Sequence, residues 1–189
     1  MNIGLYFGSF NPIHTGHLII ANHVLNETEI KRIWFVVSPQ NPFKINQFLL
    51  NEYERFQLAR LALENDSRMK AINIEFNLPK PSYTINTLAY LKEKHPQEKF
   101  SIIMGSDSFV NLNKWKNFEE IITEYRICVY KRMGFEIENK INANLTILDA
   151  PLIQISASQI RELIKKKKSI RYLVPEEVRE EIEIRKLFI

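Results

Sequence analysis

The sequence has 189 residues, of which 45% are hydrophobic and 25% are charged, and this length lies within the ~100–200 residues of one globular domain. A single cysteine, Cys128, excludes an intramolecular disulfide and a thiolate metal cluster. The longest apolar run, residues 33–37, is far shorter than the ~20 residues of a bilayer-spanning helix, and no secretory signal is recognisable. We therefore expect one cytoplasmic domain over residues 1–189, without a membrane partner.

The formal net charge is +4 and the isoelectric point is about 9.1, which suits an anionic ligand and equally an ordinary basic protein. The densest run of cations, residues 165–168, ends a helical pattern, where positive charge faces the negative end of the helix dipole. Aromatic residues do not interleave with this run, although single-strand-binding proteins supply stacking rings beside their cations. We therefore expect a solvated helix end and no nucleic-acid partner.

Short β-branched runs alternate with longer amphipathic ones along the chain, which indicates βαβ units, a parallel sheet and an α/β fold. Strands are expected, in chain order, at 3–7, 33–37, 71–76, 100–104 and 126–130, with a weaker one at 145–148. Apolar spacing predicts helices at 17–25, 52–63 and 83–91. Pro175 followed by two glutamates predicts the start of a last helix, and the C-terminal part from about 156 to 189 is expected to be helical.

An open parallel sheet binds its ligands beyond the carboxyl ends of the strands, where the strand order reverses. The loops in question, 8–17, 38–51, 77–84, 105–115 and 151–161, hold nearly every residue suited to chemistry. Neither Gly-Lys-Ser/Thr nor Gly-x-Gly occurs, which excludes a Walker-type phosphate loop and the usual dinucleotide fingerprint. Gly-x-Ser-x-Gly and His-Glu-x-x-His are also absent, which removes the commonest α/β-hydrolase and zinc-protease interpretations.

The loop after the first expected strand carries two histidines three residues apart, His14 and His17. His17 opens a helix, so its imidazole and the unpaired backbone N–H groups of the first turn can face one anionic group together. Two other interpretations stay open, namely ordinary turn and cap residues or a zinc pair, although no third zinc ligand is convincingly spaced. The loop is therefore a candidate phosphate-binding site, and no protein-held metal is expected.

A second candidate lies near the other end of the chain. Ser156 and Gln159 form a capping box in which each side chain satisfies a backbone N–H of the first helical turn. Ser158 and Arg161 are left unexplained by that local role and suit phosphate binding at the same helix start. A solvated helix arginine is the alternative for Arg161.

The first motif, Gly-x-Phe-x-Pro-x-His-x-Gly-His over residues 8–17, resembles the signature of the nucleotidyltransferase superfamily with the HIGH-type motif. Residues 155–161 are similar to the second motif of that superfamily, which grips the outer phosphates of ATP. Members commonly have an aspartate where this chain has Asn11. The resemblance implies a Rossmann-like doubly wound parallel sheet with helices on both faces, and an ATP site formed by Gly8, Ser9, Phe10, His14, His17, Gly105, Asp107, Ile155, Ser158 and Arg161.

Three further segments, 81–88, 105–107 and 112–115, resemble those that distinguish nicotinate mononucleotide adenylyltransferases within the superfamily. This resemblance implies transfer of AMP from ATP to nicotinate mononucleotide, giving nicotinate adenine dinucleotide (deamido-NAD) and pyrophosphate, with Mg²⁺ carried by the ATP phosphates. It implies His14, His17, Lys44 and Arg161 as catalytic residues, and a mononucleotide site formed by Ser82, Tyr83, Thr84, Trp115, Asp107 and Lys44. A core tryptophan is the alternative for Trp115, and a solvated loop lysine for Lys44.

The alternatives for the activity are nicotinamide mononucleotide or phosphopantetheine adenylyl transfer, or a non-catalytic nucleotide sensor. The sequence leaves open whether the chain forms a homo-oligomer.

Overall fold

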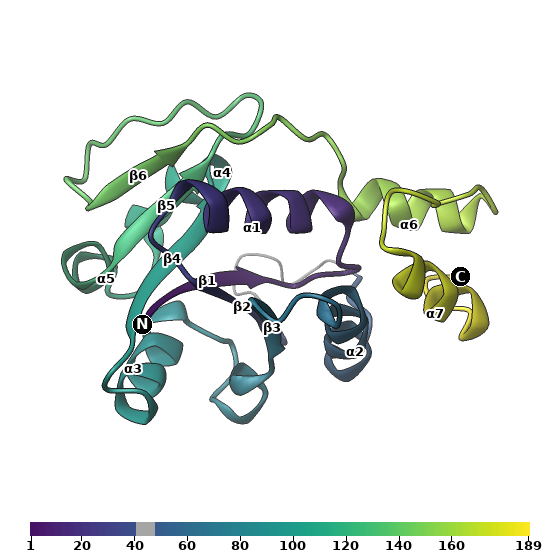
Figure 1. The fold of residues 1–189 in the computed structure, drawn as a ribbon, viewed down its shortest axis with the longest axis horizontal. Helices are drawn as coiled ribbons and strands as arrows, with labels where there is room; N and C mark the ends of the chain where they lie inside the picture. Colours follow the sequence, from purple (N-terminus) through teal and green to yellow (C-terminus); the bar gives the residue numbers. More distant parts are fainter. Residues whose placement is uncertain (41–47) are drawn as a thin grey trace.

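In the computed structural model, which describes residues 1–40 and 48–189, six parallel strands form one sheet in the order β3-β2-β1-β4-β5-β6 (Figure 1). The strands are β1 (Asn2–Gly8), β2 (Arg32–Val37), β3 (Met69–Ile72), β4 (Lys99–Gly105), β5 (Arg126–Tyr130) and β6 (Leu145–Leu148). The α-helices are α1 (Thr15–Glu27), α2 (Glu52–Leu63), α3 (Thr84–Lys94), α4 (Ser106–Phe109), α5 (Phe118–Glu124), α6 (Ala157–Lys165) and α7 (Glu176–Ile184). Two short 3₁₀ helices, η1 (Ile74–Asn77) and η2 (Leu112–Lys114), complete the described elements.

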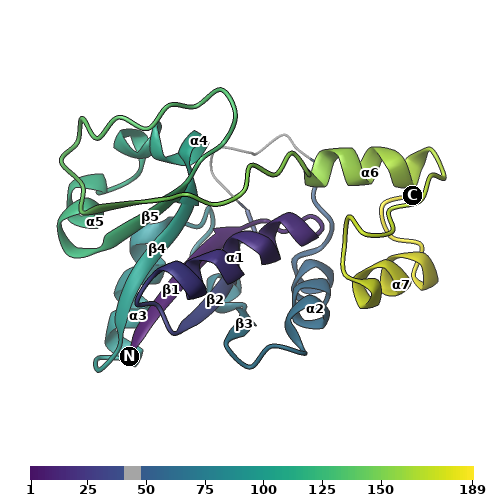
Figure 2. The same cartoon turned by 45° about the horizontal axis from the view of Figure 1, so that its top comes forward.

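Successive side chains of a strand point to opposite faces of the sheet. The buried strands carry apolar side chains on both faces, and helices cover each face. On β1, Leu5 belongs to the core that contains residues of α3, α4 and α5, whereas Tyr6 belongs to the core that contains residues of α1, α2, α6 and α7. Figures 1 and 2 show α1 lying across one face of the sheet. The doubly wound parallel sheet expected from the sequence is thus confirmed.

The strand order reverses between β1 and β4. The chain leaves β1 through α1 to β2 on one side, and it returns through α3 to β4 on the other side of β1. The carboxyl ends of β1 and β4, at Gly8 and Gly105, therefore flank the crevice in which a sheet of this order binds its ligands.

The strand expected at 71–76 is wrong in its second half. β3 ends at Ile72, and the backbone turns into η1, where Phe76 N donates to Asn73 O at 3.0 Å. In a strand, Ile74 and Phe76 would face the same side, but here Ile74 packs against the core under α3 and Phe76 against the core under α2. The alternating apolar pattern therefore arises from packing against two cores, and not from a strand with one buried face.

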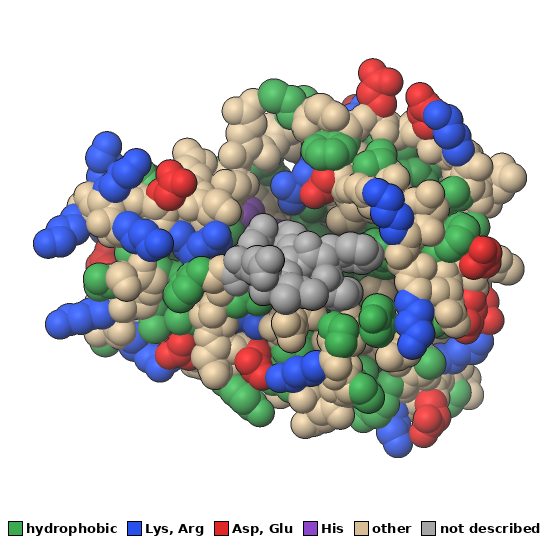
Figure 3. All heavy atoms as spheres, turned by 180° about the vertical axis from the view of Figure 1, so that it is seen from behind, with side chains coloured by type: hydrophobic (Ala, Val, Ile, Leu, Met, Phe, Trp, Pro, Cys, Tyr) green, Lys and Arg blue, Asp and Glu red, His purple; other side chains and the backbone are tan. Residues whose placement is uncertain are grey.

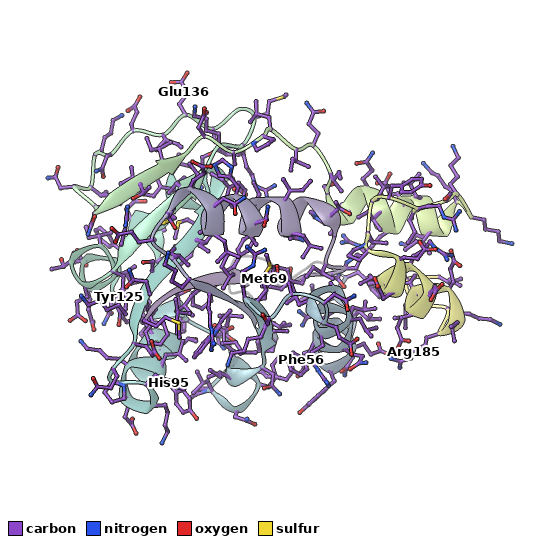
Figure 4. The ribbon with its side chains drawn as sticks, in the orientation of Figure 1. Phe56, Met69, His95, Tyr125, Glu136 and Arg185 are labelled. Carbon is purple, nitrogen blue, oxygen red and sulfur yellow. The ribbon has the colours of Figure 1, made fainter. Side chains whose placement is uncertain are left out.

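The C-terminal helices lie at the end of the molecule beyond the carboxyl ends of the strands (Figures 1 and 2). α7 packs beside α2, and Arg185 Nη2 donates to Glu54 Oε1 at 2.9 Å. Figure 4 shows Phe56 of α2 and Arg185 on these neighbouring elements. Pro175 is the N-cap of α7 rather than part of its first turn. The single-domain division stays a prediction.

The loop between α6 and α7 also reaches the first residue of α1. The backbone N–H of Thr15 donates to Leu173 O at 2.9 Å, and its hydroxyl donates to Tyr172 O at 3.2 Å. The C-terminal segment thus satisfies a backbone donor at the N-terminus of α1, where four such groups lack intrahelical partners. Within the described ranges, no helix is both long and apolar enough to cross a bilayer.

Candidate active site

A cavity of about 320 Å³ opens at the carboxyl ends of β1 and β4. Every candidate site residue named from the sequence lines this cavity, apart from Lys44, which lies outside the described residues. Figure 3, seen from the side opposite to Figure 1, shows a hollow next to the grey atoms in which a histidine and side chains of both charges come together. The structure therefore brings segments from the whole length of the chain to one place.

The loop after β1 is built on the ring of Phe10. This residue has φ 44°, and its ring is buried against Tyr6 and Phe35. A Cβ at position 8 would come within 2.8 Å of that ring, and a ring packed in the core cannot move away. Gly8 is therefore required for the loop to pass over Phe10, whose side chain supports the loop from below.

The two histidines of this loop stack on each other, with ring centroids 3.7 Å apart and an angle of 25° between the planes. The backbone N–H of His14 donates to Nδ1 of His17 at 3.2 Å. A neutral His17 must then carry its proton on Nε2, because Nδ1 accepts this bond. His14 is buried, and this burial, together with the positive charge of Arg132, lowers its pKa to about 4. His14 is therefore neutral near pH 7.

The helix start near the C-terminus meets this loop directly. Arg161 Nη1 donates to the carbonyl oxygen of Asn11 at 2.7 Å, and Nη2 donates to Ser158 Oγ at 3.1 Å. Partial burial lowers the pKa of Arg161, which stays protonated. Ser156 Oγ accepts from Gln159 N at 3.2 Å and so caps α6 as expected. The two motifs are 150 residues apart in sequence at this contact, and they form one wall of the cavity.

Asn11 lines the cavity, and its side chain is hydrogen-bonded to the backbone of another segment. Its Nδ2 donates to Phe48 O at 2.8 Å, and its Oδ1 accepts from Leu50 N at 3.1 Å. One amide therefore ties the loop after β1 to the segment before α2. An aspartate could accept the second bond but could not donate the first.

Arg132, which sequence reasoning missed, projects from the carboxyl end of β5 into the cavity. Its Nε lies 3.1 Å from Asp107 Oδ1, and its Nη2 donates to the hydroxyl of Tyr130 at 3.0 Å. A Cβ at Gly105 would collide with the Asp107 carboxylate, so this glycine makes room for the ion pair. Asp107 lies within the first turn of α4 and is not its N-cap, which is Gly105. The sequence signal that could have identified Arg132 is its position just after a strand.

The opposite end of the cavity is formed by the segment before α3 and by Trp115. Tyr83 is the N-cap of α3, and Lys116 Nζ lies 4.8 Å from the centre of the Tyr83 ring. Trp115 packs against the core under α3 and also lines the cavity. The two interpretations of this tryptophan are therefore compatible, because the residue both packs against the core and lines the cavity.

A second residue missed by sequence reasoning, Arg55 of α2, is fully buried at 0% exposure. Its guanidinium donates to four carbonyl oxygens, those of Ser9 at 2.5 Å, Ser38 at 2.8 Å, Pro39 at 3.0 Å and Leu50 at 2.8 Å. Burial lowers its pKa to about 10, so it remains charged near neutral pH. The apolar spacing of α2 gave no signal that one arginine of this helix is buried.

No group of three or more His, Cys, Asp or Glu side chains in residues 1–40 and 48–189 is arranged to hold a metal ion. The carboxylate of Asp107 lines the cavity and is already paired with Arg132. Cys128 is buried within β5, and burial raises the pKa of its thiol. The arrangement suits a polyanionic ligand that faces two imidazoles and at least two guanidinium groups.

The fold and the site define a nucleotide-transferring enzyme of the α/β class, and comparison with known proteins agrees. The family model described as Cytidylyltransferase-like matches residues 5–163. A protein of Cytophaga hutchinsonii named probable nicotinate-nucleotide adenylyltransferase is 50% identical over 100% of this chain and 98% of its own. A protein of the same name from Flavobacterium psychrophilum is 48% identical over 94% of each chain. The chain belongs to the cytidylyltransferase-like family and, within it, to the nicotinate-nucleotide adenylyltransferases.

A solved structure with the same fold is the nicotinic acid mononucleotide adenylyltransferase of Plasmodium falciparum complexed with NaAD. It has a TM-score of 0.83 and is 22% identical, and the match covers 99% of this chain and 97% of that one. At this identity the likeness shows the fold, and it supports the Rossmann-like arrangement described above.

Proposed function

We propose that this protein transfers the AMP group of ATP to nicotinate mononucleotide and releases nicotinate adenine dinucleotide (deamido-NAD) and pyrophosphate. The observation that carries the proposal is the contact between Arg161 and the loop of His14 and His17, which makes one cationic wall at the switch point of the sheet. The names of the relatives, and the ligand of the Plasmodium falciparum enzyme, support the same substrates. The activity belongs to NAD biosynthesis, and we place it in the cytoplasm.

The phosphate chain of ATP is assigned to this cationic wall. His14 and His17 would donate to the α-phosphate region, and Ser158 and Arg161 would hold the departing pyrophosphate. The loop after β1 contributes backbone N–H groups, and the N-terminus of α1 adds its positive dipole. Gly8, Ser9, Phe10, Gly105, Asp107 and Ile155 complete the proposed ATP site. The expected role of Lys44 falls outside the described residues and stays a prediction.

The mononucleotide is assigned to the opposite end of the cavity. Trp115 offers a flat ring for the pyridine, and stacking of a base on an aromatic side chain is worth ~1–3 kcal/mol. Residues 82–84 line the same cavity, and their hydroxyls, together with the backbone N–H groups of Tyr83 and Thr84, would hold the carboxylate. A carboxylate accepts hydrogen bonds only, so a site made of donors favours nicotinate over nicotinamide.

The chemical step requires no general base, because the attacking group is a phosphate that is already an anion. Catalysis then reduces to in-line alignment of the two substrates and stabilisation of charge on the transferred phosphoryl group. A neutral His14 fits this scheme, since each neutral imidazole still offers one N–H donor. Mg²⁺, bound to ATP through the phosphate oxygens, would neutralise part of their charge.

Incubation of the protein with ATP, Mg²⁺ and nicotinate mononucleotide tests the proposal. Formation of pyrophosphate and of the dinucleotide in equal amounts is expected, and omission of the mononucleotide should abolish both. Parallel kcat/KM measurements with nicotinamide mononucleotide establish the base preference, and 4′-phosphopantetheine tests the other acceptor. Binding of ATP without any pyrophosphate from any acceptor would identify a nucleotide sensor and overturn the proposal.

A further inference from the structure

Glu75 is an acidic side chain buried at the floor of the cavity. It lies in η1, directly after β3, with 1% of its surface exposed. Oε1 accepts a hydrogen bond from Thr87 Oγ1 of α3 at 2.8 Å, whereas Oε2 has no partner among the described residues. No lysine or arginine of residues 1–40 and 48–189 forms an ion pair with it.

Folding stability alone does not explain a carboxyl group at this place. Burying a charged or polar group that is incompletely paired costs free energy, and an apolar side chain of similar volume is often neutral or better for stability. Burial raises the pKa of Glu75, and the hydroxyls of Thr87, Ser38 and Ser82 oppose this shift. These hydroxyls come from the loop after β2, the turn before α3 and α3 itself. Glu75 therefore lies where three cavity-forming segments meet.

The bond to Thr87 fixes the start of α3. Thr87 lies in the first turn of that helix, and its backbone N–H donates to Tyr83 O at 3.4 Å. Asn86 N donates to the same oxygen at 3.0 Å, so a bond that holds Thr87 also holds the turn at Tyr83. Ser82, one residue earlier, is buried against the cavity, and in the part of the chain that is described its hydroxyl opposes the raised pKa of Glu75 without making a hydrogen bond of normal geometry.

We propose that Glu75 is a positioning residue for the mononucleotide, because it holds Thr87 and thereby sets the conformation of residues 82–84 at that end of the cavity. The inference rests on the proposed function, which assigns this segment to the mononucleotide. Among the described residues, Glu75 forms no hydrogen bond or ion pair with Arg161 or His14. Its effect should therefore appear in the binding of one substrate and not of the other.

The test compares Glu75→Met, Thr87→Val, the double variant and Glu75→Gln in steady-state kinetics. Loss of the bond from either side should raise KM for nicotinate mononucleotide about 10-fold, because one buried bond and its orphaned partner are lost. KM for ATP should stay within about 2-fold, as should kcat at saturation. The double variant should resemble either single variant, because both remove the same bond. Glu75→Gln keeps an acceptor for Thr87 and should restore a KM near that of the wild type.

Leu91→Ala provides the control for stability. Leu91 is fully buried on α3, away from the cavity, so its truncation should lower the melting temperature without changing KM for either substrate. Thr87→Val is nearly isosteric and keeps the test usable if Glu75→Met does not fold. A wild-type protein that forms no product would remove the proposed function and this inference together. An active wild type with unchanged KM in both single variants, equal changes in KM for the two substrates, or additive effects in the double variant would overturn this inference alone.

Discussion

Arg161 Nη1 lies 2.7 Å from the carbonyl oxygen of Asn11, and this hydrogen bond joins the start of α6 to the loop after β1. A second bond, from Nη2 to Ser158 Oγ, holds the guanidinium plane at the helix start. An arginine has five N–H donors, and these two bonds are the ones it makes within the described residues. The remaining donors are available to an anion in the cavity, while the loop carbonyl fixes the orientation of the group.

Substitution of Arg161 should therefore weaken the stabilisation of charge on the departing pyrophosphate in the transition state. In Arg161→Ala we expect kcat/KM for ATP to fall by on the order of 10²–10³, as when a donor to developing charge is lost. Arg161→Lys should recover only part of this, because an ammonium cannot reproduce a planar fork. Lys165→Ala, in the last turn of the same helix, is the matched control and should stay within about 2-fold because that cation is solvated. Equal losses in the alanine variants at 161 and 165 would rule out the assigned role.

The tautomer of His17 gives a second prediction. Because Nδ1 accepts the backbone N–H of His14, the donor of the neutral ring is Nε2. His17→Ala should lower kcat by on the order of 10²–10³ with a modest change in KM, if this donor acts in the transition state. His23→Ala, a change on the same helix two turns further along, should leave kcat unchanged. An unaltered kcat in His17→Ala would remove the residue from the mechanism.

His14 predicts how stability depends on pH. Its pKa in the folded protein is about 4, whereas the ordinary value is 6.5, so between these values the unfolded chain binds the proton and the folded protein does not. The free energy of unfolding then rises with pH through this window. The contribution of this group is complete above pH 6.5, and acidification to pH 4 removes about 3 kcal/mol of it.

Urea unfolding of the wild type and of His14→Gln from pH 7 to pH 4 measures this contribution as a difference between the two proteins. The raised pKa of Glu75 changes the free energy of unfolding with pH in the opposite direction. Glu75 is present in both proteins, so its contribution cancels in the difference. Parallel stability curves for the two proteins would show that the burial of His14 does not govern its titration.

The parallel sheet could be predicted from the sequence because strand runs and turn residues are local signals. Five of the expected strands are present with ends that differ by two residues or fewer. The remaining strand, expected at 71–76, is wrong at Ile74 and Phe76. These two side chains alternate with polar ones because they pack against two different cores. Periodicity reports which side chains are apolar, and it cannot distinguish one core from two.

That His14, His17 and Arg161 line one cavity could be predicted, because their residue types, their spacing and the place of their loops at the strand ends agreed, and their roles stay predictions. The site could not be predicted for Arg55 or Glu75, because each acts through contacts made by the tertiary fold, whereas Arg132 follows a strand and offered a signal that sequence reasoning did not use. Arg55 lies in a helix whose polar residues are expected to face solvent, and four backbone carbonyls from separate loops are what bury it. Asn11 likewise gains its role only through the carbonyl of Phe48 and the amide of Leu50.

Arg55 donates hydrogen bonds to four buried carbonyl oxygens. We therefore expect its substitution to lower the free energy of unfolding more than that of any other buried side chain. In Arg55→Met these oxygens would lose their donors in a place where water cannot replace them, and each orphaned buried group costs about 1–3 kcal/mol. The loops after β1 and β2 would relax together, so we expect the free energy of unfolding to fall by at least about 3 kcal/mol and ATP binding to weaken. The free energy of unfolding of Arg55→Lys should lie between those of the wild type and Arg55→Met, because an ammonium has three donors and keeps the charge.

Arg60, exposed on the same helix, supplies the matched control, since Arg60→Met should change stability by no more than about 0.5 kcal/mol. Urea titrations followed by circular dichroism, with ATP binding measured below the transition, distinguish the two positions. A similar small change at both would mean that water or rearranged backbone satisfies the four carbonyls. The anchoring of the two loops would then need another explanation.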